Sequence, residues 1–220
     1  AALRVVSLAP SLSEIVVELD SADLLVGVLD AGERPAAIAD VPSVGRYGQL
    51  DMERLLSLKP DLLLLWPASV GAGQRDLLKR LNIPIFVAEP HTLTQLAAQI
   101  EAIAEQIGRP ERGAKRAAKL REQLDDLRQR YRRDVPLRVF YQVWDKPLYT
   151  VGGGQIISDA LEVCGARNVF ADLDLPAPQV SIEAVLQRDP EVIVAGDQAQ
   201  LEAWTAWPQV AAVRQGRLLL

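Results

Sequence analysis

An internal repeat constrains the fold of this chain more than any other feature of its sequence. Residues 51–66 read DMERLLSLKPDLLLLW, and residues 181–196 read SIEAVLQRDPEVIVAG. Each copy predicts a capping residue, a short amphipathic helix, a proline turn and a buried parallel strand. Two shorter echoes pair residues 3–7 with 137–141 and residues 22–25 with 166–170. We therefore predict two similar α/β lobes, and a cleft between lobes is where small ligands usually bind.

Apolar and amphipathic segments alternate along the chain, which is typical of an α/β protein. The predicted fold has two α/β lobes with parallel sheets: an N-terminal lobe over 1–108, a long bridging helix over 109–135 and a C-terminal lobe over 136–220. Because a helix is stiffer than a coil hinge, a large closure of the lobes is not expected. The predicted strands are 5–8, 24–29, 62–66, 83–88 and 137–143, and the predicted helices are 52–58, 74–81, 93–107, 110–133 and 155–164.

Three local signals give further expectations. Ser11 followed by Glu14 predicts a capping box at the start of a helix. In residues 30–49, turns are set by Pro35, Pro42, Gly45 and Gly48, so this stretch is predicted to be rich in loops. Cys164 ends an apolar helical pattern and is predicted to be a buried small hydrophobe; as the single cysteine, it excludes an internal disulfide.

Composition excludes several classes of protein. With 220 residues, of which 49% are hydrophobic, the chain can form substantial cores. Its longest apolar run, 62–67, is far shorter than the roughly 20 residues that span a bilayer. The net charge of -5 argues against a nucleic-acid partner. The opening Ala1-Ala2-Leu3-Arg4 suits a mature product whose signal peptide has been removed after a small residue, although a cytoplasmic chain can begin in the same way.

Residues that follow the predicted strands are the candidates for ligand binding, because ligands meet the carboxyl ends of parallel strands. Trp66 and Trp144 each end an apolar strand, where a flat indole either packs on a ring-shaped ligand or covers the core. Arg46 and Tyr47 lie between two glycines and form either a ligand-binding loop or a solvated turn. The strand-end segments are Ala9-Pro10-Ser11, Trp66-Pro67-Ala68-Ser69, Gln142-Val143-Trp144-Asp145 and Gly196-Asp197.

Other motifs favour structural interpretations. Gly152-Gly153-Gly154 precedes a helix, but no lysine follows in phosphate-binding spacing, so a sharp turn is preferred to an anion site. The arginine-rich run 128–133 is explained by a helix C-terminus better than by an anionic partner. His91 is the single histidine, so no histidine cluster for a metal can form. We find no pattern that requires catalysis or a catalytic cofactor.

Several segments resemble the helical-backbone class of periplasmic substrate-binding proteins, which deliver cobalamin, haem or ferric siderophores to ABC importers. The matching segments are VSLAPS with Ser13-Glu14 in residues 6–14, LVGV in 25–28, VPSVG in 41–45, residues 51–62, LEVCGARNVF in 161–170 and PAPQVS in 176–181. The second lobe, together with Trp66, is most similar to the cobalamin-binding members. The resemblance implies two Rossmann-like lobes bridged by one long helix. It also implies a monomeric, non-enzymatic receptor that carries cobalamin, a corrinoid, to an ABC transporter permease. Haem or a ferric siderophore is the alternative ligand, and a metal-ion receptor or a bilobal enzyme such as a tetrapyrrole chelatase is a more distant alternative.

The resemblance also implies positions for the site. The ligand-binding candidates, from the resemblance and from the strand ends together, are Pro10, Ser11, Arg46, Tyr47, Gly48, Trp66, Gln142, Trp144, Asp145, Pro178 and Gln179. The candidates for permease docking are Asp76, Asp197 and Glu202. The chain departs from the cobalamin-binding pattern in residues 30–34, DAGER, where an aromatic-rich loop is expected, and at Ala177, where a tryptophan is expected.

The last residues of the sequence give one more expectation. Residues 213–220 predict a turn and the opening of a strand, and the resemblance implies that a final helix then covers the second lobe. Without that helix an apolar face is exposed. We expect that adding the helix raises the melting temperature.

Overall fold

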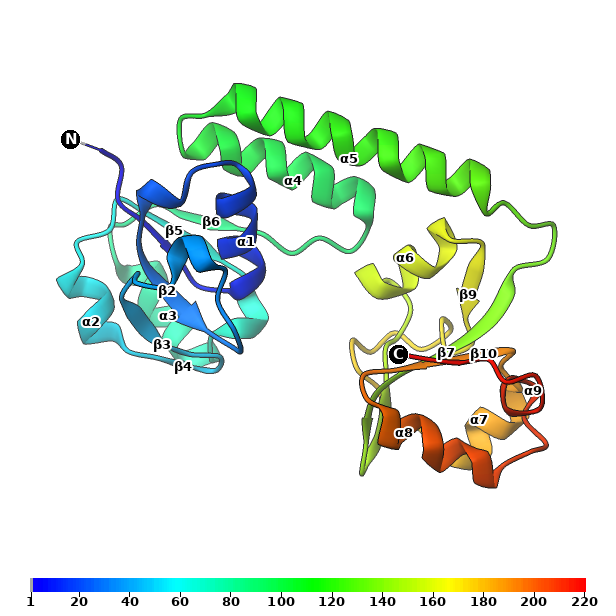
Figure 1. Ribbon diagram of the computed structural model, residues 1–220. Helices are drawn as coiled ribbons and strands as arrows, with labels where there is room; N and C mark the ends of the chain where they lie inside the picture. Colours follow the sequence, from blue (N-terminus) through cyan, green and yellow to red (C-terminus); the bar gives the residue numbers. More distant parts are fainter. Residues whose placement is uncertain (1) are drawn as a thin grey trace. The chain divides into compact units, whose positions relative to one another are not determined.

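The computed structural model describes residues 2–220, which divide into two compact units (Figure 1). The N-terminal unit comprises the residues up to Pro90 together with Thr94–Arg121. The C-terminal unit comprises His91–Leu93 and Glu122–Leu220. Each unit has its own sheet and its own hydrophobic cores.

The sheet of the N-terminal unit has six strands in the order β4-β3-β2-β1-β5-β6. All neighbours are parallel except β3 and β4, which form an antiparallel hairpin. The strands are β1 (Val5–Ser7), β2 (Leu25–Asp30), β3 (Ser43–Arg46), β4 (Gln49–Leu50), β5 (Leu62–Leu65) and β6 (Ile85–Val87). The helices are α1 (Pro10–Glu18), α2 (Met52–Ser57), α3 (Ala72–Arg80), α4 (Leu93–Gln106) and α5 (Pro110–Arg130), with 3-10 turns η1 (Ala22–Leu24), η2 (Ala36–Ile38) and η3 (Pro67–Ser69). From Glu122 onwards, the residues of α5 belong to the C-terminal unit.

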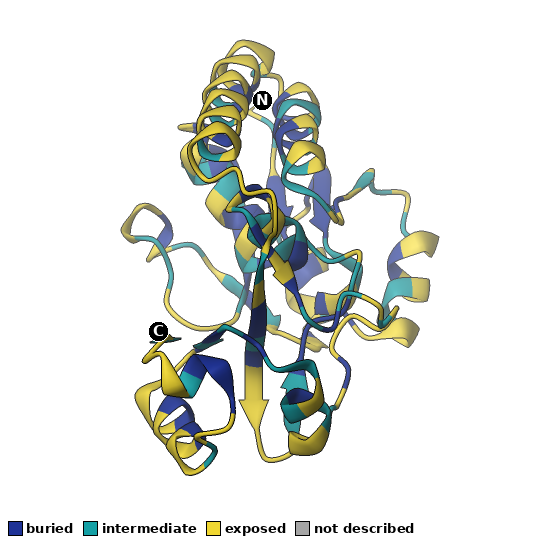
Figure 2. Ribbon diagram, turned by 90° about the vertical axis from the view of Figure 1, so that its right-hand side faces the viewer, coloured by how far each residue is buried: buried dark blue, intermediate teal, exposed yellow. Residues whose placement is uncertain are grey.

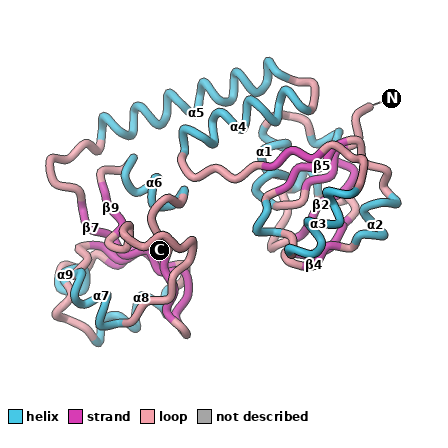
Figure 3. Tube along the Cα trace, turned by 180° about the vertical axis from the view of Figure 1, so that it is seen from behind, coloured by secondary structure: helices cyan, strands magenta, loops and turns pink. Residues whose placement is uncertain are grey.

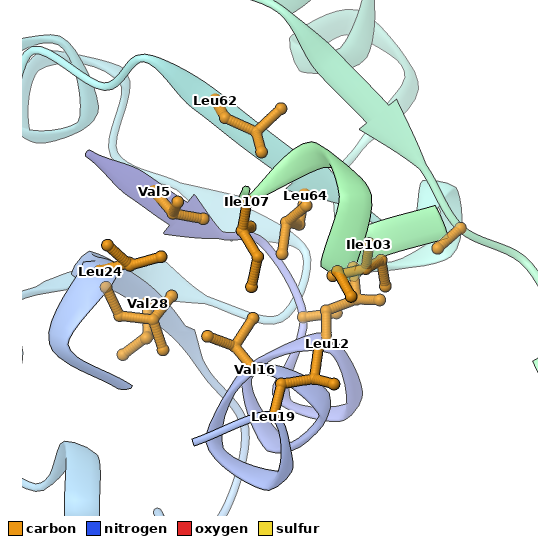
Figure 4. Close-up of a cluster of buried hydrophobic side chains, with 14 of the residues drawn as sticks. Val5, Leu12, Val16, Leu19, Leu24, Val28, Leu62, Leu64, Ile103 and Ile107 are labelled. Carbon is orange, nitrogen blue, oxygen red and sulfur yellow. The ribbon is translucent and has the colours of Figure 1, made fainter. Parts of the chain in front are cut away.

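The central strands of this sheet are buried on both faces, as expected of strands between two helical layers. Side chains alternate between the faces, so Leu62 and Leu64 join one core while Leu63 and Leu65 join the other. The first core packs the sheet against α1 and α4, with Leu12 and Ile103 among its members (Figure 4). Figure 2 shows the buried strands against helices whose outer faces are exposed.

Helices α4 and α5 lie side by side, as Figures 1 and 3 both show. Gly113 permits this close approach, because a Cβ atom at that position would lie 2.3 Å from the Cβ of Ala104. Arg109, the residue before α5, ties the start of that helix to η1 by pairing with both carboxylate oxygens of Asp23 at 2.8 and 2.6 Å. Arg116 Nε donates to Glu18 Oε2 at 2.6 Å.

The sheet of the C-terminal unit runs β11-β10-β7-β8, with β9 pairing alongside β7. Pairing is parallel except between β7 and β8. Phe140 is at the centre of the core, 5.8 Å from the ring of Phe170 and 5.7 Å from that of Trp204. The elements are β7 (Leu137–Asp145), β8 (Leu148–Thr150), α6 (Ile156–Val163), β9 (Ala166–Asn168), α7 (Ile182–Arg188), β10 (Val192–Ala195), α8 (Gln198–Ala203), η4 (Trp204–Ala206), α9 (Ala211–Arg214) and β11 (Leu218–Leu219).

The repeat predicted from the sequence is confirmed by the topology. In the N-terminal unit the strand order is β2-β1-β5-β6, and the C-terminal unit repeats it as β9-β7-β10-β11. Asp51 caps α2 by accepting from the N–H of Arg54 at 3.0 Å, and Ser181 caps α7 by accepting from the N–H of Ala184 at 3.1 Å. The strand predicted near the end of the sequence is present as β11.

Several local predictions were wrong. Helix α1 begins at Pro10 with Ala9 as its N-cap, because proline suits the first helical turn, so Ser11 lies inside the helix and does not cap it. Cys164 is exposed rather than buried, since it follows the last residue of α6. The stretch 30–49 contains β3 and β4, which the prediction of loops missed, and β4 and β8 make both sheets mixed rather than purely parallel.

Candidate functional site

Tyr47 and Trp66 form an aromatic pair at the carboxyl ends of the strands in the N-terminal unit. Their ring centroids are 6.1 Å apart, with an angle of 56° between the ring planes. Tyr47 lies in the turn between β3 and β4, and its side chain is 49% exposed. Trp66 directly follows β5 and is half-buried against the core. We call this pair the Tyr47–Trp66 surface.

The backbone around this surface is held by hydrogen bonds from three strand ends. The N–H of Tyr47 donates to the carbonyl of Asp30 at 2.9 Å, and the N–H of Gly48 donates to the carbonyl of Ser69 at 2.8 Å. Gly48 has φ +79°, a conformation that glycine adopts without strain. Ser69 Oγ donates to the carbonyls of Trp66, at 2.7 Å, and Leu8. The two aromatic side chains therefore project from a fixed backbone.

The other predicted residues of this unit lie at the same end of the sheet without a contact that joins them to the pair. Pro10 opens α1 directly after β1 and is half-buried, while Ser11 is exposed on that helix. Arg46 ends β3, and its side chain is exposed. The structure thus joins Tyr47 with Trp66 and leaves the roles of Pro10, Ser11 and Arg46 as predictions.

An ion pair organises the segment that departs from the cobalamin-binding pattern. Arg34 donates to both carboxylate oxygens of Asp30, through Nε at 2.6 Å and Nη2 at 3.0 Å, and its Nη1 donates to the carbonyl of Val41 at 2.5 Å. The Arg34 guanidinium lowers the pKa of the Asp30 carboxyl. Sequence reasoning missed this pair, although an acid and an arginine four residues apart were visible in the sequence.

The C-terminal unit contains a pocket of about 450 Å³ with aromatic and amide walls. Gln142, near the end of β7, is almost fully buried there, and its Oε1 accepts a hydrogen bond from Trp204 Nε1 at 2.6 Å. We call this site the tryptophan pocket. Its lining residues are Gln142, Asp145, Lys146, Pro147, Leu148, Gln179, Val180, Ile182, Glu183, Gln200, Ala203, Trp204 and Trp207.

Three of the predicted residues, Gln142, Asp145 and Gln179, line the tryptophan pocket. Trp144 does not line it; this side chain is 56% exposed, and its Nε1 donates to the carbonyl of Lys146 at 3.3 Å. Pro178 is buried and its carbonyl accepts from the N–H of Thr150 at 3.1 Å, so it fixes the backbone beside Gln179.

Most residues of the pocket lining were missed by sequence reasoning, among them Gln200, Trp204 and Trp207. The available signal was the pair of tryptophans three positions apart, shortly after the strand that repeats β5. Helical or 3-10 geometry places residues at that spacing on one side of the chain. The sequence does not show that they would meet a strand about 60 residues earlier.

The three carboxylates predicted to dock on the permease differ in their contacts with neighbouring residues. Asp76 is exposed on α3, 3.9 Å from Lys79 Nζ. Asp197 is the N-cap of α8 and accepts from the N–H of Gln200 at 2.8 Å. Glu202 is exposed on the same helix and accepts from Gln198 Nε2 at 3.3 Å.

The described residues contain no cluster of three or more histidine, cysteine, aspartate or glutamate side chains arranged to hold a metal ion. Within residues 2–220, no helix is long and apolar enough to cross a membrane. The triple glycine has a structural role. A Cβ at Gly152 would lie 1.9 Å from the carbonyl oxygen of Leu175, so only glycine at this position allows the two chain segments to lie this close together.

Together these features define a receptor with paired α/β units and strand-end surfaces suited to a small molecule. The sequence profile of the periplasmic binding protein family matches residues 5–220, so the chain belongs to that family, whose members are binding proteins rather than enzymes.

Several individual relatives are named as vitamin B12-binding proteins. The chain is 36% identical over 218 residues to the vitamin B12-binding protein of Vibrio cholerae, an alignment that covers 98% of this chain and 79% of that protein. The vitamin B12-binding protein of Yersinia pestis is 36% identical over 208 residues, covering 94% and 74%. The crystal structure of the periplasmic vitamin B12 binding protein BtuF of Vibrio cholerae has a TM-score of 0.90 at 35% identity, covering 99% of this chain and 87% of that chain. The periplasmic heme binding protein HutB of Vibrio cholerae has a TM-score of 0.83 at 20% identity, which shows a shared fold.

Proposed function

We propose that this chain is the substrate-binding receptor of an ABC importer and that its ligand is cobalamin. The observation that supports this proposal most directly is the 36% identity to named vitamin B12-binding proteins over 98% of the chain. The similarity to a haem-binding structure is lower, at 20% identity. Cobalamin is thus the transported ligand rather than a cofactor.

The chemistry of the two surfaces suits a corrinoid. A corrin is a broad, flat ring system with carboxamide side chains along its rim, so it requires flat apolar surfaces and hydrogen-bonding groups that carry no charge. In the N-terminal unit, the Tyr47–Trp66 surface offers flat aromatic rings on a fixed backbone. In the C-terminal unit, the tryptophan pocket combines two indoles with three glutamine side chains. We assign corrinoid binding to these two surfaces.

Haem is the second candidate, because Tyr47 is exposed at a strand end and offers a phenol oxygen to an iron. Cobalamin requires no such ligand from the protein. The two ligands are therefore compared directly in the experiment below.

Delivery to a permease requires exposed groups on the receptor. We assign docking to acidic side chains, with Asp76 on the N-terminal unit and Glu202 on the C-terminal unit. Asp197 is the weaker candidate, because its carboxylate already caps α8. The proposed receptor works in the periplasm, as the family's name implies, and we propose that it is a monomer.

The proposal is tested by calorimetric titration of the purified chain with cyanocobalamin, with haem and a ferric siderophore in parallel. We expect saturable one-to-one binding of cyanocobalamin, weakened by about tenfold or more in Trp66→Ala, since a buried aromatic contact contributes more than 1 kcal/mol at many binding sites. Tyr131→Ala, which removes an exposed aromatic outside both surfaces, is the matched control. If haem binds and cobalamin does not, the chain is still a substrate-binding receptor but its ligand is haem. If none of the three ligands binds, the proposal is contradicted.

A further inference from the structure

Helix α3 supports the hairpin that carries Tyr47. The side-chain amide of Gln74, in α3, pairs with both backbone polar groups of Leu50: its Nε2 donates to the carbonyl at 2.6 Å, and its Oε1 accepts from the N–H at 3.1 Å. Because that N–H only donates and that carbonyl only accepts, the pairing fixes the orientation of the amide. Leu50 lies in β4, the first strand in the sheet order, so no further strand of residues 2–220 pairs with its outer edge. Gln74 therefore occupies the position of a neighbouring strand beside the hairpin.

The next residue of α3 supports the backbone that follows Trp66. Nη1 of Arg75 donates to the carbonyl of Pro67 at 2.5 Å and to the carbonyl of Val70 at 3.3 Å. Pro67 directly follows Trp66 and opens η3, and Val70 is the residue after that turn. A guanidinium has a planar, rigid set of donors, so one that binds both ends of a turn restrains them relative to each other. Arg75 thus holds the turn whose first residue is bonded to Trp66.

These two supports act on one continuous piece of backbone. The N–H of Gly48, next to Tyr47, donates to the carbonyl of Ser69 in η3 at 2.8 Å, so the hairpin and the turn are joined. Helix α3 is itself anchored, because Leu78 is fully buried in the hydrophobic core that also contains Leu50. A single packed helix therefore holds the backbone on both sides of the aromatic pair.

We propose that two residues of α3 are positioning residues for the Tyr47–Trp66 surface. Gln74 fixes the hairpin that presents Tyr47. Arg75 fixes the turn that follows Trp66. This inference rests on the proposed function, in which the surface meets a corrinoid. Binding to a preordered surface costs less conformational entropy than binding to a mobile one, so loss of either support should weaken binding although neither residue belongs to the surface.

The first test measures backbone hydrogen exchange in the ligand-free chain. Gln74→Met keeps the approximate length of the side chain and removes both hydrogen bonds to Leu50. We expect the amides of residues 47–51 to exchange with deuterium about fivefold faster or more, because a local opening of the hairpin becomes less costly. Gln106→Met, which changes an exposed glutamine of α4, is the matched control and should leave these amides unchanged. Unchanged exchange at residues 47–51 in Gln74→Met would overturn the role of Gln74.

The second test measures the affinity for cyanocobalamin by equilibrium dialysis, read from the absorbance of the ligand. We expect Gln74→Met and Arg75→Met each to weaken binding about fivefold. Arg75→Lys retains a donor and should lose less. Arg80→Met, which removes an exposed arginine from the same helix, is the matched control and should stay within about twofold of the wild type.

Double variants separate positioning from a general structural role. If Gln74 acts through Tyr47, the effect of Gln74→Met should fall below about twofold in a Tyr47→Ala background. The effect of Arg75→Met should likewise fall below about twofold in a Trp66→Ala background. Losses as large without the aromatic ring as with it would overturn the inference.

The remaining outcomes distinguish this inference from the proposed function. Folded Gln74→Met and Arg75→Lys proteins that bind cyanocobalamin as tightly as the wild type would overturn the inference and leave the proposed function standing. A wild-type chain that does not bind cyanocobalamin would overturn the proposed function, and the assignment of a ligand-positioning role with it. The exchange experiment needs no ligand, so in that case it still shows whether Gln74 restrains the hairpin.

Discussion

The carboxylate of Asp61 accepts a hydrogen bond from the backbone N–H of Arg4 at 2.8 Å, and the N–H of Asp61 donates to the carbonyl of Arg4 at 2.8 Å. This reciprocal contact joins the start of β1 to the start of β5. The C-terminal unit repeats it: Glu191 accepts from the N–H of Arg138 at 3.0 Å and donates its own N–H to the carbonyl of Arg138 at 2.8 Å. The repeat thus preserves a particular contact as well as the order of the strands.

Removal of either carboxylate should destabilise the chain. We expect Asp61→Ala or Glu191→Ala to lower the free energy of unfolding by about 0.5–1.5 kcal/mol, the usual contribution of one hydrogen bond. Asp61→Asn retains an acceptor and should lose less. Urea unfolding measures the change, with the exposed Asp40→Ala as a control. Equal stability of the Asp61→Ala and Asp40→Ala proteins would show that the contact contributes nothing.

Substitution by glycine should have different effects on stability at Lys59 and Asp189, which precede the matching prolines Pro60 and Pro190. Lys59 and Asp189 both have left-handed backbone conformations, with φ 48° and 43°, in which a side chain is strained by about 1–2 kcal/mol. We expect Lys59→Gly to be neutral or stabilising by up to about 1 kcal/mol, since released strain is offset by greater chain entropy. Asp189→Gly should destabilise the chain, because Asp189 Oδ1 accepts from the N–H of Ala211 at 2.8 Å. Thermal melts of both variants check the contrast, which a loss of stability at residue 59 would contradict.

The sequence predicted the features that depend on neighbouring residues. The caps at Asp51 and Ser181 and the buried run of β5 follow from local patterns that occur twice. Where two local signals competed, the prediction was wrong: Pro10 sets the start of α1, so Ser11 does not become a cap. The hydrogen bond between Gln142 and Trp204 joins residues 62 positions apart, and no local pattern indicates it. For this reason the strand-end residues of the site were predictable, whereas the wall contributed by α8 and η4 was not.

The contact between α4 and α5 predicts opposite effects of alanine at two helical glycines. Alanine is usually favoured over glycine inside a helix by about 1 kcal/mol. At Gly113, however, the added Cβ would lie 2.3 Å from the Cβ of Ala104, so Gly113→Ala should destabilise the chain by about 1–3 kcal/mol through overpacking. At Gly73 in α3, a Cβ meets nothing within 4 Å, so Gly73→Ala should stabilise it. Melting temperatures that move in the same direction for both variants would contradict this account of the helix contact.

The hydrogen bond from Trp204 to Gln142 should matter more than the size of the indole. Trp204→Phe keeps an aromatic ring beside Phe140 but leaves the buried oxygen of Gln142 without its donor, which should cost about 1–3 kcal/mol. If the hydrogen bond is responsible, Gln142→Leu combined with Trp204→Phe should be less destabilising than the sum of the single changes. Denaturant unfolding of the four proteins gives the coupling energy, and a value of zero would assign the effect to packing alone.

The Asp30–Arg34 pair should make stability depend on pH in the acid range. The Arg34 guanidinium lowers the pKa of Asp30 below its ordinary value of 3.8, so the folded chain binds the proton less readily than the unfolded chain does. The stabilisation is therefore fully present above that ordinary value and is lost as the pH falls through the lower pKa of the folded state. Asp23 beside Arg109 and Asp172 beside Arg188 have lowered pKa values and the same sign. We expect Asp30→Asn to reduce the melting temperature at pH 7 and to differ little from the wild type below about pH 3. A deficit of the variant that is as large at pH 2.5 as at pH 7 would show that the ionised carboxylate is not what stabilises the segment from Asp30 to Val41.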